Sequence, residues 1–157
     1  MRALSVTILL ATLLLPSGHA LASPPIDISP EELQILQRQA AKGDARVQNN
    51  LAELYYTGKG VPQDYEKARY LWEQAAGQGV AEAQYLIGAL YAIGGAGPQD
   101  IVRGYMWLNL AAANLTGDMQ KHVADTGDEF ARRMTPAQIT QAQEMATQCQ
   151  VRNFKGC

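Results

Sequence analysis

Two consecutive stretches of 36 residues decide the fold. Residues 43–78 read GDARVQNNLAELYYTGKGVPQDYEKARYLWEQAAGQ, and residues 79–114 read GVAEAQYLIGALYAIGGAGPQDIVRGYMWLNLAAAN. Aligned without gaps, the two stretches share eleven identical residues, whereas the roughly 7% usage of the commonest residues would give about two or three by chance. A repeat period in the thirties is typical of a solenoid built from helix pairs. The identical pairs are Gly43/Gly79, Ala45/Ala81, Gln48/Gln84, Leu54/Leu90, Tyr55/Tyr91, Gly58/Gly94, Pro62/Pro98, Gln63/Gln99, Asp64/Asp100, Ala75/Ala111 and Ala76/Ala112.

Each copy reads as a first helix, a loop and a second helix. Packing residues recur every three or four positions in the first helix, which places them on one helix face. Gly58 and Gly94 are expected to end the first helices, because glycine takes the left-handed conformation without a Cβ penalty. Asp64 and Asp100 suit the N-cap of the second helices, which run to about Ala76 and Ala112. The first-helix residues are Ala45, Gln48, Leu51, Ala52 and Tyr55, then Ala81, Gln84, Ile87, Gly88 and Tyr91.

The second helices carry buried stripes of their own. In the first copy the stripe is Tyr65, Ala68, Trp72 and Ala75, and in the second copy it is Met106, Trp107, Leu110 and Ala111. The small residues Ala52 and Gly88 on the first helices leave room for a neighbouring helix to approach closely. The sequence therefore predicts an all-α chain.

Further helices flank the repeats. Ser29 to Glu32 forms a capping box with proline at the first helical position, and it predicts a helix through Ala41. Thr135 to Gln138 is a second capping box, which starts a last helix to about Cys149. Between them the apolar residues Met119, Val123, Phe130 and Met134 form a looser helical stripe. Gly127 interrupts that stripe and argues against one straight helix.

The chain begins with the pattern of a secretory signal peptide. A basic start at Arg2 precedes an uncharged apolar run over residues 3–15, and small residues at Ala20 and Ala22 suit cleavage after Ala22. The apolar run is well short of the roughly 20 residues that span a bilayer. We expect an exported protein, periplasmic or secreted, and no membrane insertion after cleavage.

The expected organisation is a signal peptide at 1–22, a linker at 23–29, a helical domain at 30–150 and a tail at 151–157. The domain holds the repeats 43–78 and 79–114 and a degenerate helix pair at 117–150. The cysteines Cys149 and Cys157 are the only two in the chain. Thiols tend to pair in an oxidising compartment, although a frayed tail could also leave them unpaired or paired between molecules.

Composition argues against several functions. Lys and Arg total 13 against 15 Asp and Glu, a net charge of −2 that becomes −3 when Arg2 is removed. No basic excess exists to neutralise the phosphates of nucleic acid. Removal of residues 1–22 leaves His122 as the one histidine and Ser23 and Ser29 as the serines, so we expect no catalytic site and no enzyme. His122, Asp125 and Glu129 could share one helix face as a partial metal site, but a solvated face is the better interpretation, and no metal or cofactor is expected.

The repeat pattern resembles the Sel1-like repeat family, a relative of tetratricopeptide repeats. The first copy carries it as Ala45-x-x-Gln48-x-x-Leu51-Ala52-x-x-Tyr55-x-x-Gly58-x-Gly60-Val61-x-x-Asp64-Tyr65-x-Lys67-Ala68, and the second copy in the stretch from Gly104 to Ala112. Residues 134–138 resemble a helix start that often closes such proteins. The resemblance implies a right-handed stack of antiparallel helix pairs that binds proteins or peptides, as an adaptor or envelope regulator, and a monomer when free.

By analogy with tetratricopeptide repeats, the first helices line an inner groove. The expected groove residues are Arg46, Asn49, Asn50, Glu53 and Tyr56 in the first copy and Glu82, Tyr85, Leu86, Ala89 and Ile93 in the second. Two alternatives stay open. The chain could be a structural or self-assembling subunit without a free groove. A cysteine-rich branch of the family is linked to β-lactams, but that branch has a cysteine pair in each repeat, and neither repeat here has one.

Overall fold

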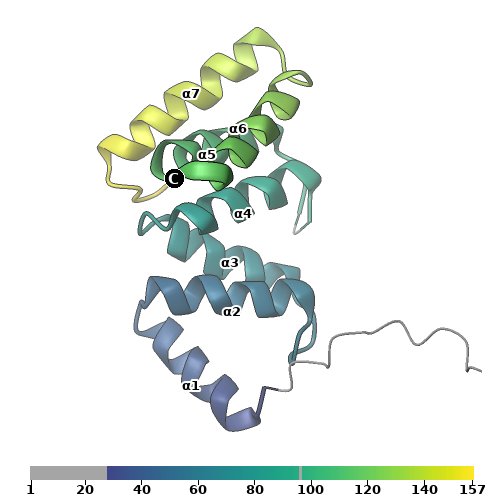
Figure 1. The fold of residues 1–157 in the computed structure, drawn as a ribbon, viewed down its shortest axis with the longest axis vertical. Coiled ribbons are helices and arrows are strands. Elements are labelled where there is room, and N and C mark those ends of the chain that lie inside the picture. The colour runs from purple at the N-terminus through teal and green to yellow at the C-terminus, as the bar shows by residue number, and fades with distance from the viewer. Residues whose placement is uncertain (1–27, 96) are drawn as a thin grey trace, which may run out of the picture.

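The computed structural model describes residues 28–95 and 97–157, which form seven helices and no strand. The helices follow one another along a stack from α1 at one end to α7 at the other (Figure 1). Their bounds are α1 Pro30–Ala41, α2 Ala45–Thr57, α3 Tyr65–Ala76, α4 Ala81–Ile93, α5 Ile101–Asn114, α6 Gly117–Ala131 and α7 Pro136–Val151. The predicted all-α solenoid is confirmed. The predicted signal peptide lies outside the described residues.

The helix ends form where the local sequence predicts them. Ser29 and Thr135 both make capping boxes, and the carboxylates of Asp64 and Asp100 accept from the backbone N–H groups three residues on, at 3.0 and 2.9 Å. The C-cap glycines Gly58 and Gly94 each have φ of 71°, in the left-handed region. The two repeats therefore end their first helices and begin their second helices with the same local chemistry.

Small residues bring the two helices of the second repeat unusually close. A Cβ added at Gly104 would lie 2.8 Å from the carbonyl oxygen of Gly88, and one added at Gly88 would lie 3.0 Å from that of Gly104. The first repeat has Ala52 and Ala68 at the same positions, and both are completely buried. The expected close approach at Gly88 is thus confirmed, and its contact on α5 is Gly104.

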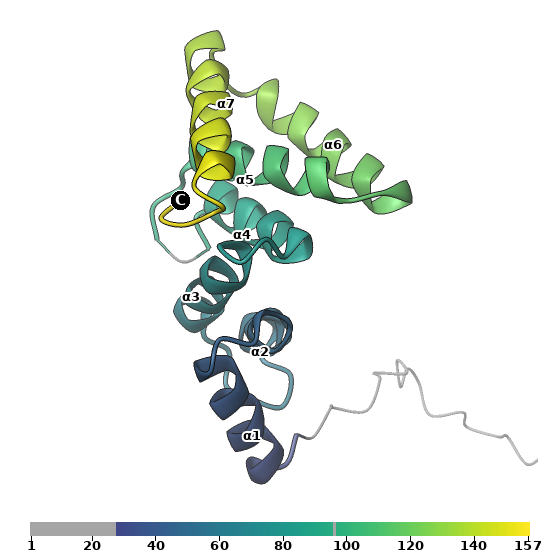
Figure 2. The ribbon, with the colours of Figure 1, turned by 90° about the vertical axis from the view of Figure 1, so that its left-hand side faces the viewer.

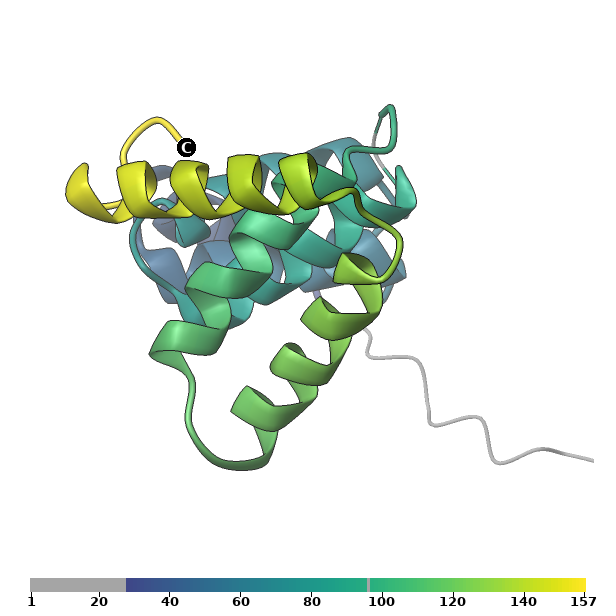
Figure 3. The ribbon, with the colours of Figure 1, turned by 90° about the horizontal axis from the view of Figure 1, so that it is seen from above.

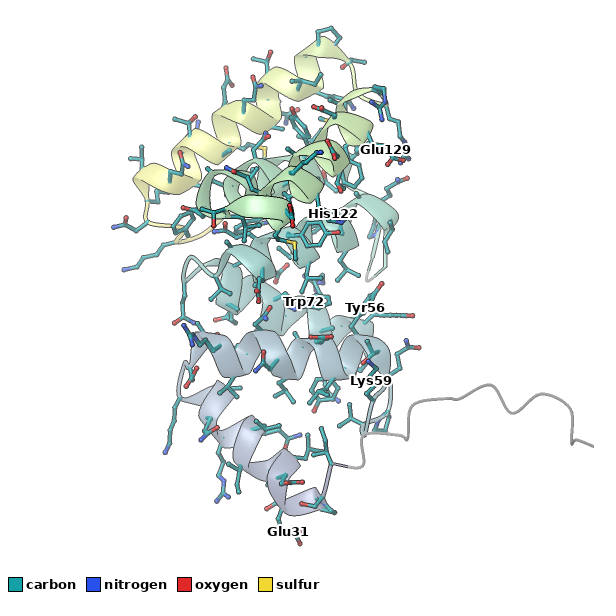
Figure 4. All side chains as sticks on the ribbon, in the orientation of Figure 1. Glu31, Tyr56, Lys59, Trp72, His122 and Glu129 are labelled. Atoms are coloured by element: carbon teal, nitrogen blue, oxygen red, sulfur yellow. A yellow bond between two sulfur atoms is a disulfide. The ribbon has the colours of Figure 1, made fainter. Side chains whose placement is uncertain are left out.

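Each repeat buries one tryptophan. Trp72 and Trp107 are 1% and 3% exposed. The Trp72 ring packs against that of Tyr56, tilted by 50° and with ring centroids 5.3 Å apart, and Figure 4 shows these two side chains next to each other. Tyr65 was expected in the buried stripe of α3, and that prediction is wrong, because 41% of its surface is exposed. Tyr65 is the first residue of α3 and lies over the ring of Tyr56, at a centroid distance of 5.4 Å, at the edge of the core.

The third helix pair departs from the first two. Helices α6 and α7 both contact α5, and Figure 3 shows them diverging from the turn that joins them. Helix α6 runs unbroken through Gly127, so the predicted interruption is wrong: the glycine is buried, and a Cβ there would meet the Tyr105 ring at 3.7 Å. Tertiary packing on α5 outweighs the weak helix propensity of one glycine. Met119, also expected inside, is 45% exposed in the first turn of α6.

The C-terminal tail folds back onto the stack. Cys149 in α7 and Cys157 form a disulfide with Cα atoms 5.5 Å apart, which settles the open question of their pairing. The chain reverses at Asn153 and Phe154, which have positive φ of 50° and 61°. This places the Phe154 ring against the turn between α3 and α4, where a Cβ added at Gly79 would be 3.4 Å from it. Among residues 28–95 and 97–157, every helix is too short or too polar to cross a bilayer.

Candidate functional site

The first helix of each pair lies on the same side of the stack. Figure 2 shows α2, α4 and α6 following one another along one side, with α3 and α7 along the other. We call the surface that α2, α4 and α6 present on this side of the stack the inner face, because the sequence analysis expects the groove of the solenoid there. Most of the predicted groove residues present side chains there: Arg46, Asn50, Glu53, Glu82 and Ile93 are exposed, and Tyr56, Tyr85, Leu86 and Ala89 are half-buried.

Asn49 is placed differently from its prediction. Only 6% of this residue is exposed, and its carbonyl oxygen is buried without a hydrogen-bond partner. Asn49 was expected to line the groove, but its burial turns the amide toward the protein. Tyr56 is also partly committed to packing, since its ring lies between Tyr65 and Trp72. Of the residues predicted for α2, Arg46, Asn50 and Glu53 are therefore the ones whose side chains are exposed.

A hydrogen bond links α4 to α6 across the inner face. The Tyr85 hydroxyl lies 3.0 Å from Nε2 of His122, and the two rings meet edge-on at 5.7 Å. His122 was considered only as a solvated residue or a partial metal ligand, because nothing in the sequence pairs it with a residue 37 positions away. Figure 4 shows His122 and Glu129 on α6, beyond Tyr56 along the stack. The third pair thus extends the inner face.

A polar network joins the second repeat to the first on the opposite side of α4. The Tyr91 hydroxyl donates to Glu73 at 2.5 Å, Arg69 donates to the same carboxylate at 2.8 Å, and Arg103 lies over the Tyr91 ring at 5.2 Å. Burial raises the pKa of Tyr91, and the bond to Glu73 raises it further. The hydrogen bond to Tyr91 is the largest of the causes that raise the pKa of Arg103. Tyr91 thus remains a neutral hydrogen-bond donor between the charged residues.

The first repeat holds a weaker version of this network. Tyr55, at the position of Tyr91, accepts from the amide of Gln37 at 3.0 Å, and Lys67 lies over its ring at 5.1 Å. Lys67 also pairs with Asp64 at 3.0 Å. The backbone N–H of Lys67 lowers the pKa of the Asp64 carboxyl, and Asp64 in turn raises the pKa of Lys67. The matched Tyr and Lys/Arg positions were visible in the sequence, but their partners in the preceding helix were not.

Two hollows on this side follow the repeat. The first outer groove, about 480 Å³, lies between α1, α2 and α3, and the second, about 630 Å³, lies between α3, α4 and α5. Gly43, Gln48 and Gln74 line both. The first is lined by Gln37, Ala40, Ala41, Gly43, Gln48, Leu51, Tyr55, Lys67, Tyr70, Leu71 and Gln74. The second is lined by Gly43, Gln48, Glu73, Gln74, Gly77, Gln78, Tyr91, Arg103 and Trp107, with Phe154, Lys155, Gly156 and Cys157 of the tail.

The described residues offer little for covalent or metal chemistry. Cys149 and Cys157, the two cysteines of the chain, are held in the disulfide. Within the described ranges, no three His, Cys, Asp or Glu side chains gather as a set of metal ligands. What the described surface offers is a broad helical face and two grooves, which suit recognition of another chain.

Comparisons with known proteins agree with this architecture. The family model described as Sel1 repeat matches residues 45–80 and 81–114. Among solved structures, a protective antigen present in uropathogenic Escherichia coli strains, described as displaying an SLR fold, is 29% identical with a TM-score of 0.69; the match covers 75% of this chain and 25% of that one. A Sel1 repeat protein from Oxalobacter formigenes is 26% identical with a TM-score of 0.55, over 76% of this chain and 49% of that one.

This chain therefore spans about a quarter and about half of the length of these two proteins. No curated protein sequence gives a significant match. The matched repeats begin two residues later than the predicted 43–78 and 79–114, at the starts of α2 and α4, and the second ends at the predicted residue 114. Residues 45–80 and 81–114 are therefore two Sel1 repeats, and the chain shares the SLR fold of these solved structures.

Proposed function

We propose that this chain is an exported interaction module that binds a protein or peptide on its inner face, as an adaptor or regulator in the cell envelope. Sel1-repeat proteins generally mediate protein–protein interactions, and a scaffold of this kind is typically not catalytic. Export is supported by the signal-peptide pattern of residues 1–22 and by the disulfide, which forms readily in an oxidising compartment.

The observation that carries the proposal is the contrast between the exposed residues of α2 and α4. Helix α2 presents Arg46, Asn50 and Glu53, which are exposed and polar or charged. Helix α4 presents an apolar strip that ends at Ile93, of which 64% is exposed. An apolar contact beside polar residues is the arrangement of a binding surface, where the apolar part supplies affinity and the polar rim supplies orientation.

Helix α6 continues the apolar strip. Met119 is 45% exposed one turn before His122, whose ring is held by Tyr85. The Tyr85–His122 contact fixes two side chains that would otherwise lose rotamer freedom on binding, so less entropy is lost when a partner docks. Partner contacts are therefore expected to extend from α2 through α4 to the first half of α6.

Site-specific photo-crosslinking tests the proposal. A photoreactive residue is placed at Asn50 or Ile93 on the inner face, or at Gln143, an exposed residue of α7, as the control. The chain is expressed in an export-competent host and irradiated. We expect the same partner to be crosslinked from positions 50 and 93 but not from 143, and the Ile93→Asp substitution to weaken its capture about tenfold or more, as loss of an interface anchor does.

Three results would count against the proposal. Equal crosslinking from position 143 would move the binding surface elsewhere. Crosslinks only between copies of the chain would favour the self-assembling subunit. Fractionation gives the separate test of export: retention of residues 1–22 on a cytoplasmic chain, measured by intact mass, would contradict the envelope location.

A further inference from the structure

The first outer groove lies on the opposite side of α2 from the inner face. Gln48, Leu51 and Tyr55 of α2 line this groove, whereas Arg46, Asn50 and Glu53 belong to the inner face. At 100° per residue these two sets point in opposite directions. Whatever the first outer groove binds, it can bind while the inner face is occupied.

The second outer groove shows what such a groove accepts. Its wall is completed by the chain's own tail, whose Phe154 ring covers Gly79 at the turn between α3 and α4. The backbone oxygen of Phe154 also approaches Gly77, lying 3.3 Å from the position of an added Cβ. A short non-helical segment with one aromatic side chain therefore packs on the turn that precedes α4.

The first repeat offers the same turn with its surface open. Gly43 and Ala41 occupy the positions of Gly79 and Gly77, and both line the first outer groove. An added Cβ at Gly43 meets no atom of the described residues within 4 Å, in contrast to the 3.4 Å contact at Gly79. In the first outer groove Leu71 occupies the repeat position that Trp107 occupies in the second, so a smaller side chain lines the first groove. The ring of Tyr70, which is 60% exposed, lies at its edge.

The two grooves differ in charge. Lys67, whose ammonium also pairs with Asp64, is the one charged residue among those that line the first outer groove, because Gln37 stands where the second has Glu73. The second groove combines Glu73 with two bases, Arg103 and the tail residue Lys155. Because its lining carries a base and no acid, the first groove suits an acidic segment.

We infer that the first outer groove is a second docking site, for a segment of a partner protein that carries an aromatic residue next to a carboxylate. The aromatic ring packs over Gly43 between Tyr70 and Leu71, in the way that Phe154 packs over Gly79. The carboxylate lies toward Lys67. This site is independent of the proposed function of the inner face.

Two fluorescent peptides test the inference on the purified protein. One has the sequence of the tail, acetyl-Arg-Asn-Phe-Lys-Gly-amide, and the other is its acidic counterpart, acetyl-Glu-Asn-Phe-Glu-Gly-amide. Fluorescence anisotropy should show that the acidic peptide binds about tenfold tighter, a difference that one favourable charge contact supplies. Ala41→Glu, an exposed substitution in the groove, balances the charge of Lys67 and should remove this preference.

Tyr70→Ala gives an independent test by shape. It removes the exposed ring at the edge of the first groove and should weaken binding of both peptides about tenfold. Circular dichroism checks that this variant folds, and Ala41→Glu decides the question if it does not. Ile93→Asp on the inner face is the matched control and should leave peptide affinity unchanged. No binding of the acidic peptide, equal affinity for the two peptides, binding that Ala41→Glu leaves unaltered, or binding lost in Ile93→Asp would overturn the inference.

Discussion

The two repeats bury their tryptophans one position apart, and that shift gives them different surfaces. In the first repeat Leu71 precedes Trp72, and in the second Trp107 precedes Leu108. One residue turns a side chain by about 100° around a helix. Trp72 stacks under Tyr56 and supports the inner face, while Trp107 lines the second outer groove. The first repeat therefore has an inner face supported by Trp72 and an outer groove without the tail, and the second has an outer groove walled by the tail and an apolar inner face.

Removal of Trp72 should have the largest effect. Trp72→Ala empties a site that is 1% exposed, so the free energy of unfolding should fall by about 3–5 kcal/mol. Urea denaturation followed by far-ultraviolet circular dichroism measures this loss. Tyr70→Ala, two residues away and 60% exposed, is the control and should change stability by no more than roughly 0.5 kcal/mol. Similar losses for the two variants would show that Trp72 is not a core residue.

The tail gives the next largest expected difference between the repeats. Cys149→Ala with Cys157→Ala removes the disulfide. The unfolded chain then gains conformational freedom, so the free energy of unfolding should fall by about 2–3 kcal/mol. Hydrogen exchange should accelerate at Gly79, which Phe154 covers, and stay unchanged at Gly43, which no described residue covers. Phe154→Ala, with the disulfide intact, should accelerate exchange at Gly79 alone. Equal acceleration at both glycines would mean that the tail stabilises the whole stack.

An exchange of Gly and Ala at the helix contacts should destabilise both repeats, but for different physical reasons. Gly104→Ala places a Cβ 2.8 Å from a backbone oxygen, and this strain of about 1–3 kcal/mol should outweigh the roughly 1 kcal/mol that alanine adds to helix propensity. Ala68→Gly in the first repeat should cost about 1 kcal/mol from propensity alone. Thermal denaturation of the two variants compares them. A more stable Gly104→Ala would show that α4 and α5 can separate without cost.

The fold could be predicted from sequence because its signals are local and repeated. Capping boxes, Asp64 and Asp100 as N-caps, and the C-cap glycines each depend on a few neighbouring residues, and each was confirmed. Gly127 and Met119 were misjudged for the opposite reason. Their placement depends on how α6 packs on α5, and the third pair does not copy the geometry of the first two.

The surfaces could be predicted only in part. Helical spacing put Arg46, Asn50 and Glu53 on the exposed side of α2, but it could not tell that Asn49 is buried. The Tyr85–His122 bond and the contact of Phe154 with Gly79 join residues 37 and 75 positions apart, and no repeat pattern links them. The outer grooves also depend on which residues of neighbouring repeats meet, so they appear only when the helices are placed in space.

The smallest expected difference in stability between the two repeats concerns Tyr91 and Tyr55. Tyr91→Phe removes a donor to the charged Glu73 and should cost about 1–1.5 kcal/mol in a half-exposed site, while Tyr55→Phe removes a neutral acceptor for Gln37 and should cost about 0.5–1 kcal/mol. Burial raises the pKa of Tyr91 above its ordinary value of 10.0. Its neutral form therefore stabilises the folded chain below pH 10, and this contribution is lost as the pH rises through the raised pKa. The difference between wild type and Tyr91→Phe should narrow above pH 10, measured as urea midpoints from pH 8 to 11. A constant difference would mean that Glu73 is held by Arg69 alone, and the second network would then have no advantage over the first.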